Sequence, residues 1–78
     1  MSDVRYGVYT IHPIAPLKQN GKYSAAVTIE LNFSDGVRTS GSPRGLGGDF
    51  DTEDQSHRAA VQYGKDIIDG NVPGQSPP

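Results

Sequence analysis

Hydrophobic and polar residues alternate most regularly between Lys22 and Phe33. One set of positions holds Tyr23, Ala25, Val27, Ile29, Leu31 and Phe33, and the other holds Ser24, Ala26, Thr28, Glu30 and Asn32. A period of two residues is typical of a β-strand that buries one face and leaves the other in water. The pattern predicts that this segment is the central strand of an antiparallel sheet.

A longer period, close to 3.6 residues, follows Thr52 and predicts an amphipathic helix. Its apolar side, an arc of roughly 120°, would carry His57, Ala60, Val61, Gly64, Ile67 and Ile68. Thr52 and Gln55 are spaced as in a capping box, which marks the start of the helix. Gly70 followed by Pro73 marks its end, so we expect about seventeen helical residues that pack on the sheet.

Two residues of this predicted helix require a partner. Gly64 lowers helix propensity by about 1 kcal/mol relative to alanine, so we expect a strand backbone or an aromatic ring to approach it closely. Asp69 places a carboxylate at the negative end of the helix dipole. Lys65, one turn earlier, is the cation that we expect to compensate it.

The segment before the central strand predicts another strand, from Arg5 to Ile11, which Pro13 and Pro16 then interrupt. Proline in this place is typical of an edge strand. The alternation leaves two possible buried pairs, Tyr6 with Val8 or Tyr9 with Ile11. We expect Ile14 and Leu17 to cover one end of the core.

Two turns connect these predicted strands. Asn20-Gly21 is a strong hairpin signal and leads into the central strand. After Phe33, a two-residue turn would place Val37 on the solvent-exposed face of the sheet. A three-residue loop, Ser34-Asp35-Gly36 with Gly36 in the left-handed conformation, would instead pair Val37 with Phe33. We therefore expect the three-residue loop and a third strand from Val37 to about Ser42.

The remaining segments predict irregular structure. Residues 40–48 are rich in glycine and are expected to form a flexible loop that crosses to the helix. Residues 71–78 contain three prolines and are expected to form a disordered C-terminal tail. The sequence therefore predicts an α+β domain at residues 1–70, with a three-stranded antiparallel β-sheet (meander) packed against one C-terminal α-helix (βββα).

Composition narrows the range of protein classes. Only 33% of the 78 residues are hydrophobic, so the core of this single domain must be small. There is no cysteine, and the Met-Ser-Asp start lacks the basic and apolar regions of a signal peptide, so we expect a cytoplasmic protein. No apolar run is long enough to span a membrane. A net charge of −2 gives no electrostatic reason to expect nucleic acid as a partner.

Candidate chemistry is sparse. The glycine-rich loop lacks the Lys-Ser/Thr of a phosphate-binding loop. His12 and His57 stand at no recognised metal-ligand spacing, and His57 falls on the apolar side of the helix, where we expect a satisfied, partly buried histidine. Ser40 and Ser42 have no neighbouring base. We therefore expect no enzyme activity, no cofactor and no metal.

The solvated face of the predicted sheet is the candidate interaction surface, formed by Ser24, Thr28, Glu30, Asn32, Arg38 and Arg44. A three-stranded sheet with one helix is also the layout of some DNA-binding domains, which should present a basic face. Glu30 has the wrong charge for that role. We expect a non-enzymatic protein-interaction module whose partner is an unknown protein or a second copy of the chain, with nucleic-acid binding as the alternative.

The order of these segments also shows a resemblance. A Tyr-x-Val/Ile strand, the Gly-Lys-Tyr entry to the central strand, Phe50-x-Thr52 and the helix end from Gln62 to Asp69 resemble short, uncharacterised proteins of Burkholderia and related proteobacteria. The resemblance covers residues 6–70. It implies a cytoplasmic domain of three strands and one helix without an assigned activity, and it transfers no functional residue.

Overall fold

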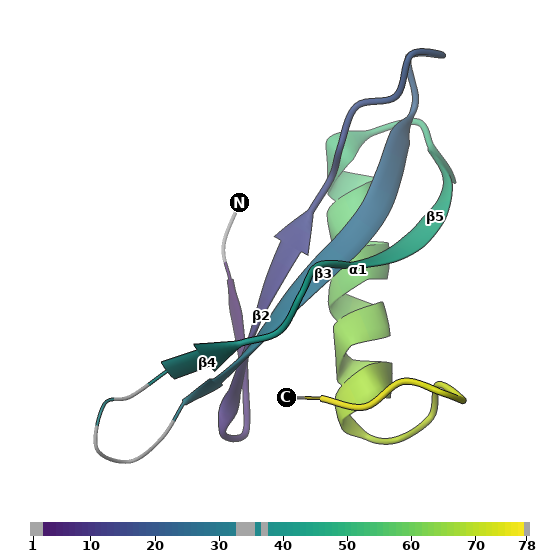
Figure 1. Ribbon diagram of the computed structural model, residues 1–78. Helices are drawn as coiled ribbons and strands as arrows, with labels where there is room; N and C mark the ends of the chain where they lie inside the picture. The colour runs from purple at the N-terminus through teal and green to yellow at the C-terminus, as the bar shows by residue number, and fades with distance from the viewer. Residues whose placement is uncertain (1–2, 33–35, 37, 78) are drawn as a thin grey trace.

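A single helix lies across one face of an antiparallel sheet (Figure 1). The computed structural model describes residues 3–32, 36 and 38–77, of which residues 38–40 are described by their backbone alone. The elements are β1 (Val4–Tyr6), β2 (Tyr9–Ile14), β3 (Tyr23–Asn32), β4 (Arg38–Ser40), β5 (Arg44–Phe50) and α1 (Glu53–Ile68). The predicted α+β class with a C-terminal helix is confirmed, but the predicted number of strands is wrong.

The strand order places β3 at the centre of the sheet. Ala26 and Val27 pair with both β2 and β5, and Glu30 and Leu31 pair with both β2 and β4. Because a strand has only two edges, β4 and β5 must share the edge of β3 opposite β2. The five strands therefore occupy four positions, with β1 outermost beside β2.

The predicted first strand is in fact a hairpin. Its turn consists of Gly7 and Val8, and Gly7 has a φ of 63°, which favours glycine. The turn restarts the alternation, so that Tyr6 and Tyr9 pair on the helix side of the sheet. Of the two possible buried pairs, Tyr9 with Ile11 faces the core, while Val8 is 56% exposed.

Pro13 lies inside β2, opposite Val27. β1 pairs with β2 only as far as Ile11, so the position of Pro13 has a free edge, where its missing N–H costs no ladder hydrogen bond. The expectation that Ile14 and Leu17 cover the core is wrong. Ile14 pairs with Ala26 on the face away from the helix, and Leu17 lies beyond β2 and is 66% exposed.

Both predicted turns agree with the described backbone. Asn20 and Gly21 lie in the turn before β3, where the Asn20 side-chain oxygen accepts from the Lys22 N–H at 3.0 Å. Asn32 pairs with Arg38, the register that the three-residue loop predicts, and Gly36 has a φ of 89°. Phe33, Ser34, Asp35 and Val37 lie outside the described residues.

The predicted flexible loop at residues 40–48 is wrong over most of its length, because Arg44–Phe50 form β5. The register shifts twice along β5, and Leu46 is the extra residue between the pairs Ala26↔Gly45 and Ala25↔Gly47. Where a β-bulge places a residue at positive φ it favours glycine, and Gly47 has a φ of 80°. The bulges also remove the side-chain alternation that would reveal a strand in the sequence.

Both ends of α1 agree with their predicted signals. The Thr52 side chain accepts from the Gln55 N–H at 3.1 Å, and the Gln55 side chain accepts from the Asp51 N–H at 3.2 Å. At the other end, Gly70 donates to the Ile67 carbonyl and Asn71 to the Asp66 carbonyl. This pair of hydrogen bonds, with a φ of 79° at Gly70, is a Schellman motif.

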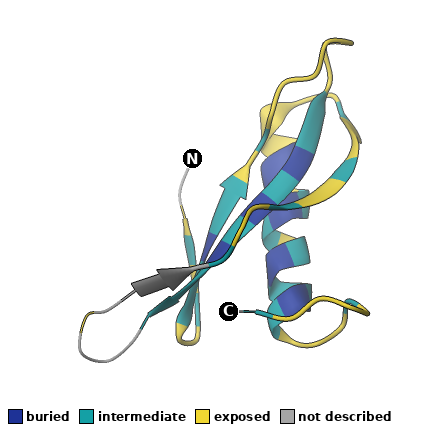
Figure 2. Ribbon diagram, in the orientation of Figure 1, coloured by how far each residue is buried: buried dark blue, intermediate teal, exposed yellow. Residues whose placement is uncertain are grey.

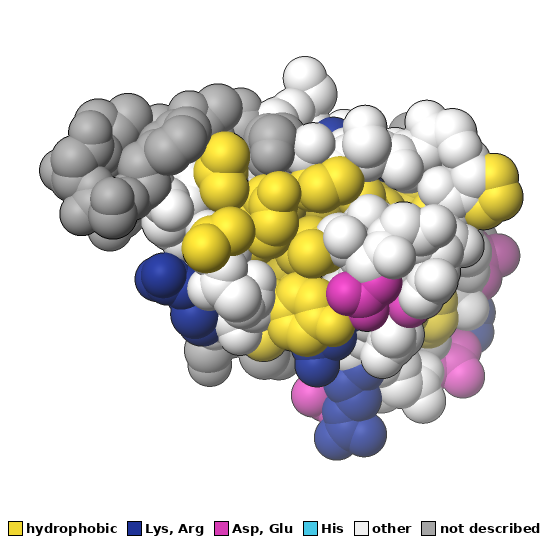
Figure 3. All heavy atoms as spheres, turned by 90° about the horizontal axis from the view of Figure 1, so that it is seen from below, with side chains coloured by type: hydrophobic (Ala, Val, Ile, Leu, Met, Phe, Trp, Pro, Cys, Tyr) yellow, Lys and Arg dark blue, Asp and Glu magenta, His cyan; other side chains and the backbone are white. Residues whose placement is uncertain are grey.

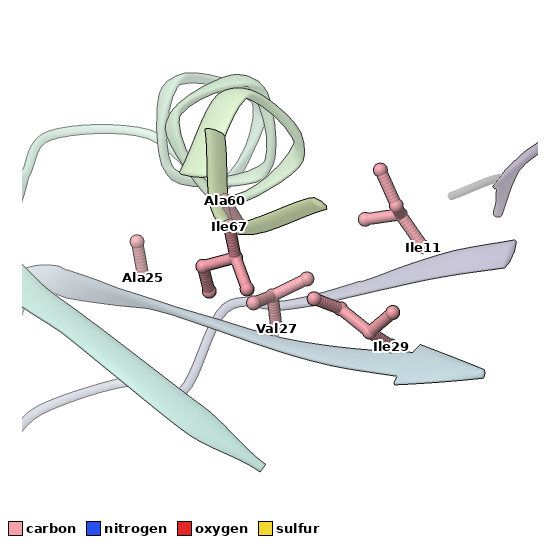
Figure 4. Packing of buried hydrophobic residues seen from close by; sticks show 6 residues of the cluster. All are labelled: Ile11, Ala25, Val27, Ile29, Ala60 and Ile67. Carbon is pink, nitrogen blue, oxygen red and sulfur yellow. The ribbon is translucent and has the colours of Figure 1, made fainter. Parts of the chain in front are cut away.

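The core lies between α1 and the middle of β2 and β3 (Figures 2 and 4). Its fully buried hydrophobic residues are Ile11, Ala25, Val27, Ile29, Ala60 and Ile67. A close approach to Gly64 is confirmed, but the predicted neighbours, a strand backbone or an aromatic ring, are wrong, because aliphatic side chains of β2 and β3 lie there. A β-carbon at Gly64 would lie 2.8 Å from Cγ2 of Ile11 and 3.2 Å from Cγ2 of Val27. A larger side chain would therefore push the helix off the sheet.

The buried side of α1 differs from the prediction at one polar residue. Ser56 is fully buried, and its hydroxyl donates to the backbone carbonyl of Ser24 at 2.5 Å. Val61 and Ile68 are only partly buried. After the helix, Val72 packs against the core, whereas disorder of residues 71–78 stays a prediction.

Candidate functional site

The face of the sheet away from α1, which we call the open face, is uncovered by other elements of the described chain (Figure 1). The alternation along β2 and β3 assigns to it Thr10, His12, Ile14, Ser24, Ala26, Thr28, Glu30 and Asn32. Four of the predicted surface residues, Ser24, Thr28, Glu30 and Asn32, therefore lie together on β3.

Polar side chains on the open face contact one another across the strands. The Asn32 side-chain amide donates to the Thr10 hydroxyl at 2.8 Å. His12 lies between two carboxylates, with Nδ1 3.0 Å from Asp3 and Nε2 3.2 Å from Glu30. These two contacts connect β2 to the residue before β1 and to β3 across the open face.

The two predicted arginines lie in different places. Arg38 pairs with Asn32 and so has an open-face position in the register, although its side chain is outside the described part of the chain. Arg44 pairs with Val27, which places it on the helix side, and its guanidinium donates to the Gln75 side chain at 3.4 Å. The change of register between β4, where Ser40 pairs with Glu30, and the start of β5 determines this position, and the sequence pattern did not reveal it.

Sequence reasoning missed the contacts of His12. The available signal was the alternation itself, because residues 10 and 12 must share the face opposite Tyr9 and Ile11. The alternation alone did not show whether Tyr9 and Ile11 or the residues between them face the helix, so the face that carries His12 could not be assigned from the sequence. The Gly7-Val8 turn resolves it, since it fixes which side of β2 faces the helix.

A concave surface, which we call the helix groove, lies between α1 and the β1–β2 hairpin and has a volume of about 380 Å³. It is lined by Val4 and Pro13 of the strands and by Asp54, His57, Arg58, Val61, Gln62 and Lys65 of α1. This volume falls in the range of pockets that bind small molecules or side chains of a partner. The prediction did not include this site.

His57 is the buried polar residue of the helix groove, with 8% of its surface exposed. The predicted burial is confirmed, but its Nδ1 has no hydrogen-bond partner among the described residues. A buried nitrogen without a partner costs free energy. Arg58 contacts the carboxylate of Asp54 at 3.0 Å. Lys65 is the other cation of the groove, and among the described residues its ammonium has no recorded carboxylate contact.

The Asp69 carboxylate is bound by Tyr6, and the expectation that Lys65 compensates it is wrong. The Tyr6 hydroxyl donates to both carboxylate oxygens, at 3.0 and 2.9 Å. This hydrogen bond, more than partial burial, raises the pKa of Tyr6 above its usual 10.0. The ammonium of Lys65 lies over the Tyr6 ring instead, 5.7 Å from its centre.

Two exposed lysine–carboxylate pairs join the turn before β3 to the end of β5. Lys18 pairs with Asp49 and Lys22 with Asp51. Lys18 and Asn20 hold the pKa of Asp49 below its usual value, and Asp51 raises the pKa of Lys22. Exposed pairs of this kind contribute little stability, and they leave these carboxylates neutralised by neighbouring lysines.

The described residues contain no group of three or more His, Asp or Glu side chains arranged to hold a metal ion. Within the same residues, α1 is too short and too polar to cross a membrane. Searches against protein-family models, curated proteins and solved structures each found no match. The function must therefore be argued from the open face and the helix groove.

Proposed function

We propose that this domain is a non-enzymatic interaction module that binds another protein through the open face of its sheet. The observation that carries the proposal is that α1 covers one face of the sheet while no other described element covers the second. A sheet face of this kind offers a flat surface of ordered side chains. Cross-strand contacts order these side chains before any other protein binds. They join Asn32 to Thr10 and His12 to Glu30.

The distribution of hydrophobic residues further supports a protein partner. Figure 3 views the molecule from the end where α1 stops, and hydrophobic side chains gather on that surface between acidic and basic ones. Ile14, on the open face, is 37% exposed. Mixed apolar and polar surfaces are typical of transient protein interfaces.

A capture experiment tests the open face directly. The tagged protein is purified from its own cells with nuclease treatment, and the bound proteins are identified. Thr28→Lys places a cation at the middle of the open face and should reduce capture of a specific partner about tenfold. Gln19→Lys adds the same charge in an exposed turn and should leave capture unchanged. Equal capture by both variants would refute the open face as the binding surface.

Self-association is the version of this proposal in which the partner is a second copy. The outer edges of β1 and of β4 and β5 pair with no other described strand, and a free edge can accept a strand of another chain. Sedimentation over a range of concentrations measures this. A sedimentation coefficient independent of concentration would leave a different protein as the partner.

Nucleic-acid binding is the second candidate, because Arg5 and Arg38 both occupy open-face positions in the register. Glu30 at the middle of that face opposes it. A labelled duplex and a labelled single strand are titrated at about 50 mM salt, where phosphate contacts are strongest. Affinity tighter than about 10 μM that weakens with salt and with Arg38→Ala, but not with Arg58→Ala on the helix, would favour this candidate.

A further inference from the structure

We propose that the helix groove and the free edge of β1 together bind an extended, acidic peptide segment of a partner protein, which adds a strand beside β1. This inference extends the proposed function, because it names a second surface through which the domain would bind protein. It concerns the helix side of the sheet and is separate from the open face.

The edge of β1 supplies the backbone contacts. Gly7 and Val8 form a two-residue hairpin turn, so Tyr6 and Tyr9 beside it form a hydrogen-bonded pair. Hydrogen-bonded and non-hydrogen-bonded pairs alternate along an antiparallel ladder, so Arg5 directs its N–H and C=O away from β2. These groups have no strand partner among the described residues and can bind the backbone of an added strand.

The groove supplies pockets for alternate side chains of that strand. Residues of an added strand point to the helix side at every second position, as Val4 and Tyr6 do in β1. There they would meet the wall formed by Val4, Val61 and Lys65. His57 lies in the same wall and is 8% exposed, so a peptide that packs on this wall would shift the NMR signals of His57.

The charges and spacing of the groove specify the peptide. Lys65 is four residues from Val61 on α1, which corresponds to about 6 Å along the helix axis. Two residues of an extended strand span about 6.6 Å, so an apolar and an acidic side chain at alternate positions match Val61 and Lys65. Because Asp54 already neutralises Arg58, Lys65 is the cation available to the acidic side chain.

Synthetic peptides test this on the intact, ¹⁵N-labelled chain by NMR. The probes are acetyl-Thr-Val-Thr-Glu-Thr-amide and its reverse, acetyl-Thr-Glu-Thr-Val-Thr-amide, which cover both strand directions. We expect one of them to shift the signals of Arg5, His57 and Val61 with a Kd of about 0.1–1 mM. Replacing Glu by Lys in the peptide should weaken binding about two- to fivefold.

Changes in the protein and in the peptide backbone separate strand addition from other binding modes. Lys65→Gln should weaken the binding of the acidic peptide about two- to fivefold. Lys22→Gln, a matched change far from the groove, should leave the binding unchanged. On the unaltered protein, N-methylation of the peptide amides that face β1 should abolish binding. N-methylation at the alternate amides, which face away from β1, should leave it intact.

Three results would overturn the inference. They are the absence of signal shifts with every peptide at about 2 mM, equal loss with either set of N-methylated amides, and equal affinity for the Glu and Lys peptides. None of them bears on capture by the open face, which the Thr28→Lys comparison measures on the opposite side of the sheet. Failure of the groove and failure of the proposed function are therefore distinguishable.

Discussion

The two flanks of β3 are built in different ways. On one flank, β2 pairs with β3 through six consecutive residue pairs without a shift. On the other, β5 pairs at four positions with two register shifts, and three of the seven residues of β5 are glycine. Buried side chains such as Ile11 fix the register of β2, whereas backbone conformations that favour glycine accommodate β5. Stability should therefore respond to side-chain changes on the first flank and to backbone changes on the second.

The largest effect should come from a charge placed in the core beside the β2 flank. Ile29 is 1% exposed, so Ile29→Asp buries an unpaired carboxylate at a cost of several kcal/mol. That cost approaches the whole stability of a small domain, and circular dichroism should show an unfolded chain. Thr28→Asp, one residue away on the open face, should stay folded. A folded Ile29→Asp variant of native stability would contradict the helix-side assignment.

Gly64→Ala tests how tightly α1 sits on the β2 flank. The added β-carbon would lie 2.8 Å from Cγ2 of Ile11, a contact that forces the helix or the strand to shift. Overpacking costs about 1–3 kcal/mol, against a gain of about 1 kcal/mol in helix propensity. We expect urea denaturation to show a net loss. A gain of about 1 kcal/mol, as helix propensity alone gives, would show that the contact is loose.

A pair of glycine substitutions isolates the backbone effect on the β5 flank. Neither Gly45 nor Gly47 has an atom within 4 Å of an added β-carbon, but only Gly47 has positive φ, at 80°. Gly47→Ala should therefore destabilise by about 1 kcal/mol. Gly45→Ala should be neutral or slightly stabilising. Equal effects in urea denaturation would mean that the bulge does not depend on the glycine conformation.

The contrast between the β2 flank and the β5 flank explains which elements could be predicted from the sequence. The pattern of β3 and the capping signals of α1 predicted the central strand, the helix bounds and the close approach at Gly64. β5 was missed because its bulges and glycines remove the period of two, and the β1–β2 hairpin was missed because Gly7-Val8 was read as part of a strand. Four predicted open-face residues of β3 lie together, but the register of β5 moves Arg44 to the helix side.

The hydrogen bond from Tyr6 to Asp69 connects the β1–β2 hairpin to the end of α1. Asp69→Asn removes the negative charge, so the pKa of Tyr6 should fall toward 10.0 in an NMR titration of the tyrosine rings. Because folding raises this pKa, the hydrogen bond contributes its full stabilisation of the folded state below about pH 10. That stabilisation is lost as the pH rises through the folded-state pKa of Tyr6. An unchanged Tyr6 pKa in Asp69→Asn would show that the hydrogen bond is not formed in solution.

The smallest effect concerns the tail beside the β5 flank. The composition of residues 71–78 predicts motion on the nanosecond scale, whereas Val72 packs against the core and Gln75 accepts from Arg44. Backbone ¹⁵N relaxation should give low order parameters after Val72. Values as high as those of α1 through Gln75 would contradict the predicted disorder.

The bulges of β5 also bear on how readily this edge of the sheet can pair with another molecule. A long, flat edge strand can pair with the same edge of another molecule, and repeated pairing leads to fibrous assemblies. The extra residue at Leu46 and the positive φ of Gly47 and Gly48 interrupt the regular row of N–H and C=O groups along this edge. The opposite edge, β1, has only three residues. The irregularity that hid β5 in the sequence therefore also makes this edge a poorer template for strand pairing than a regular strand would be.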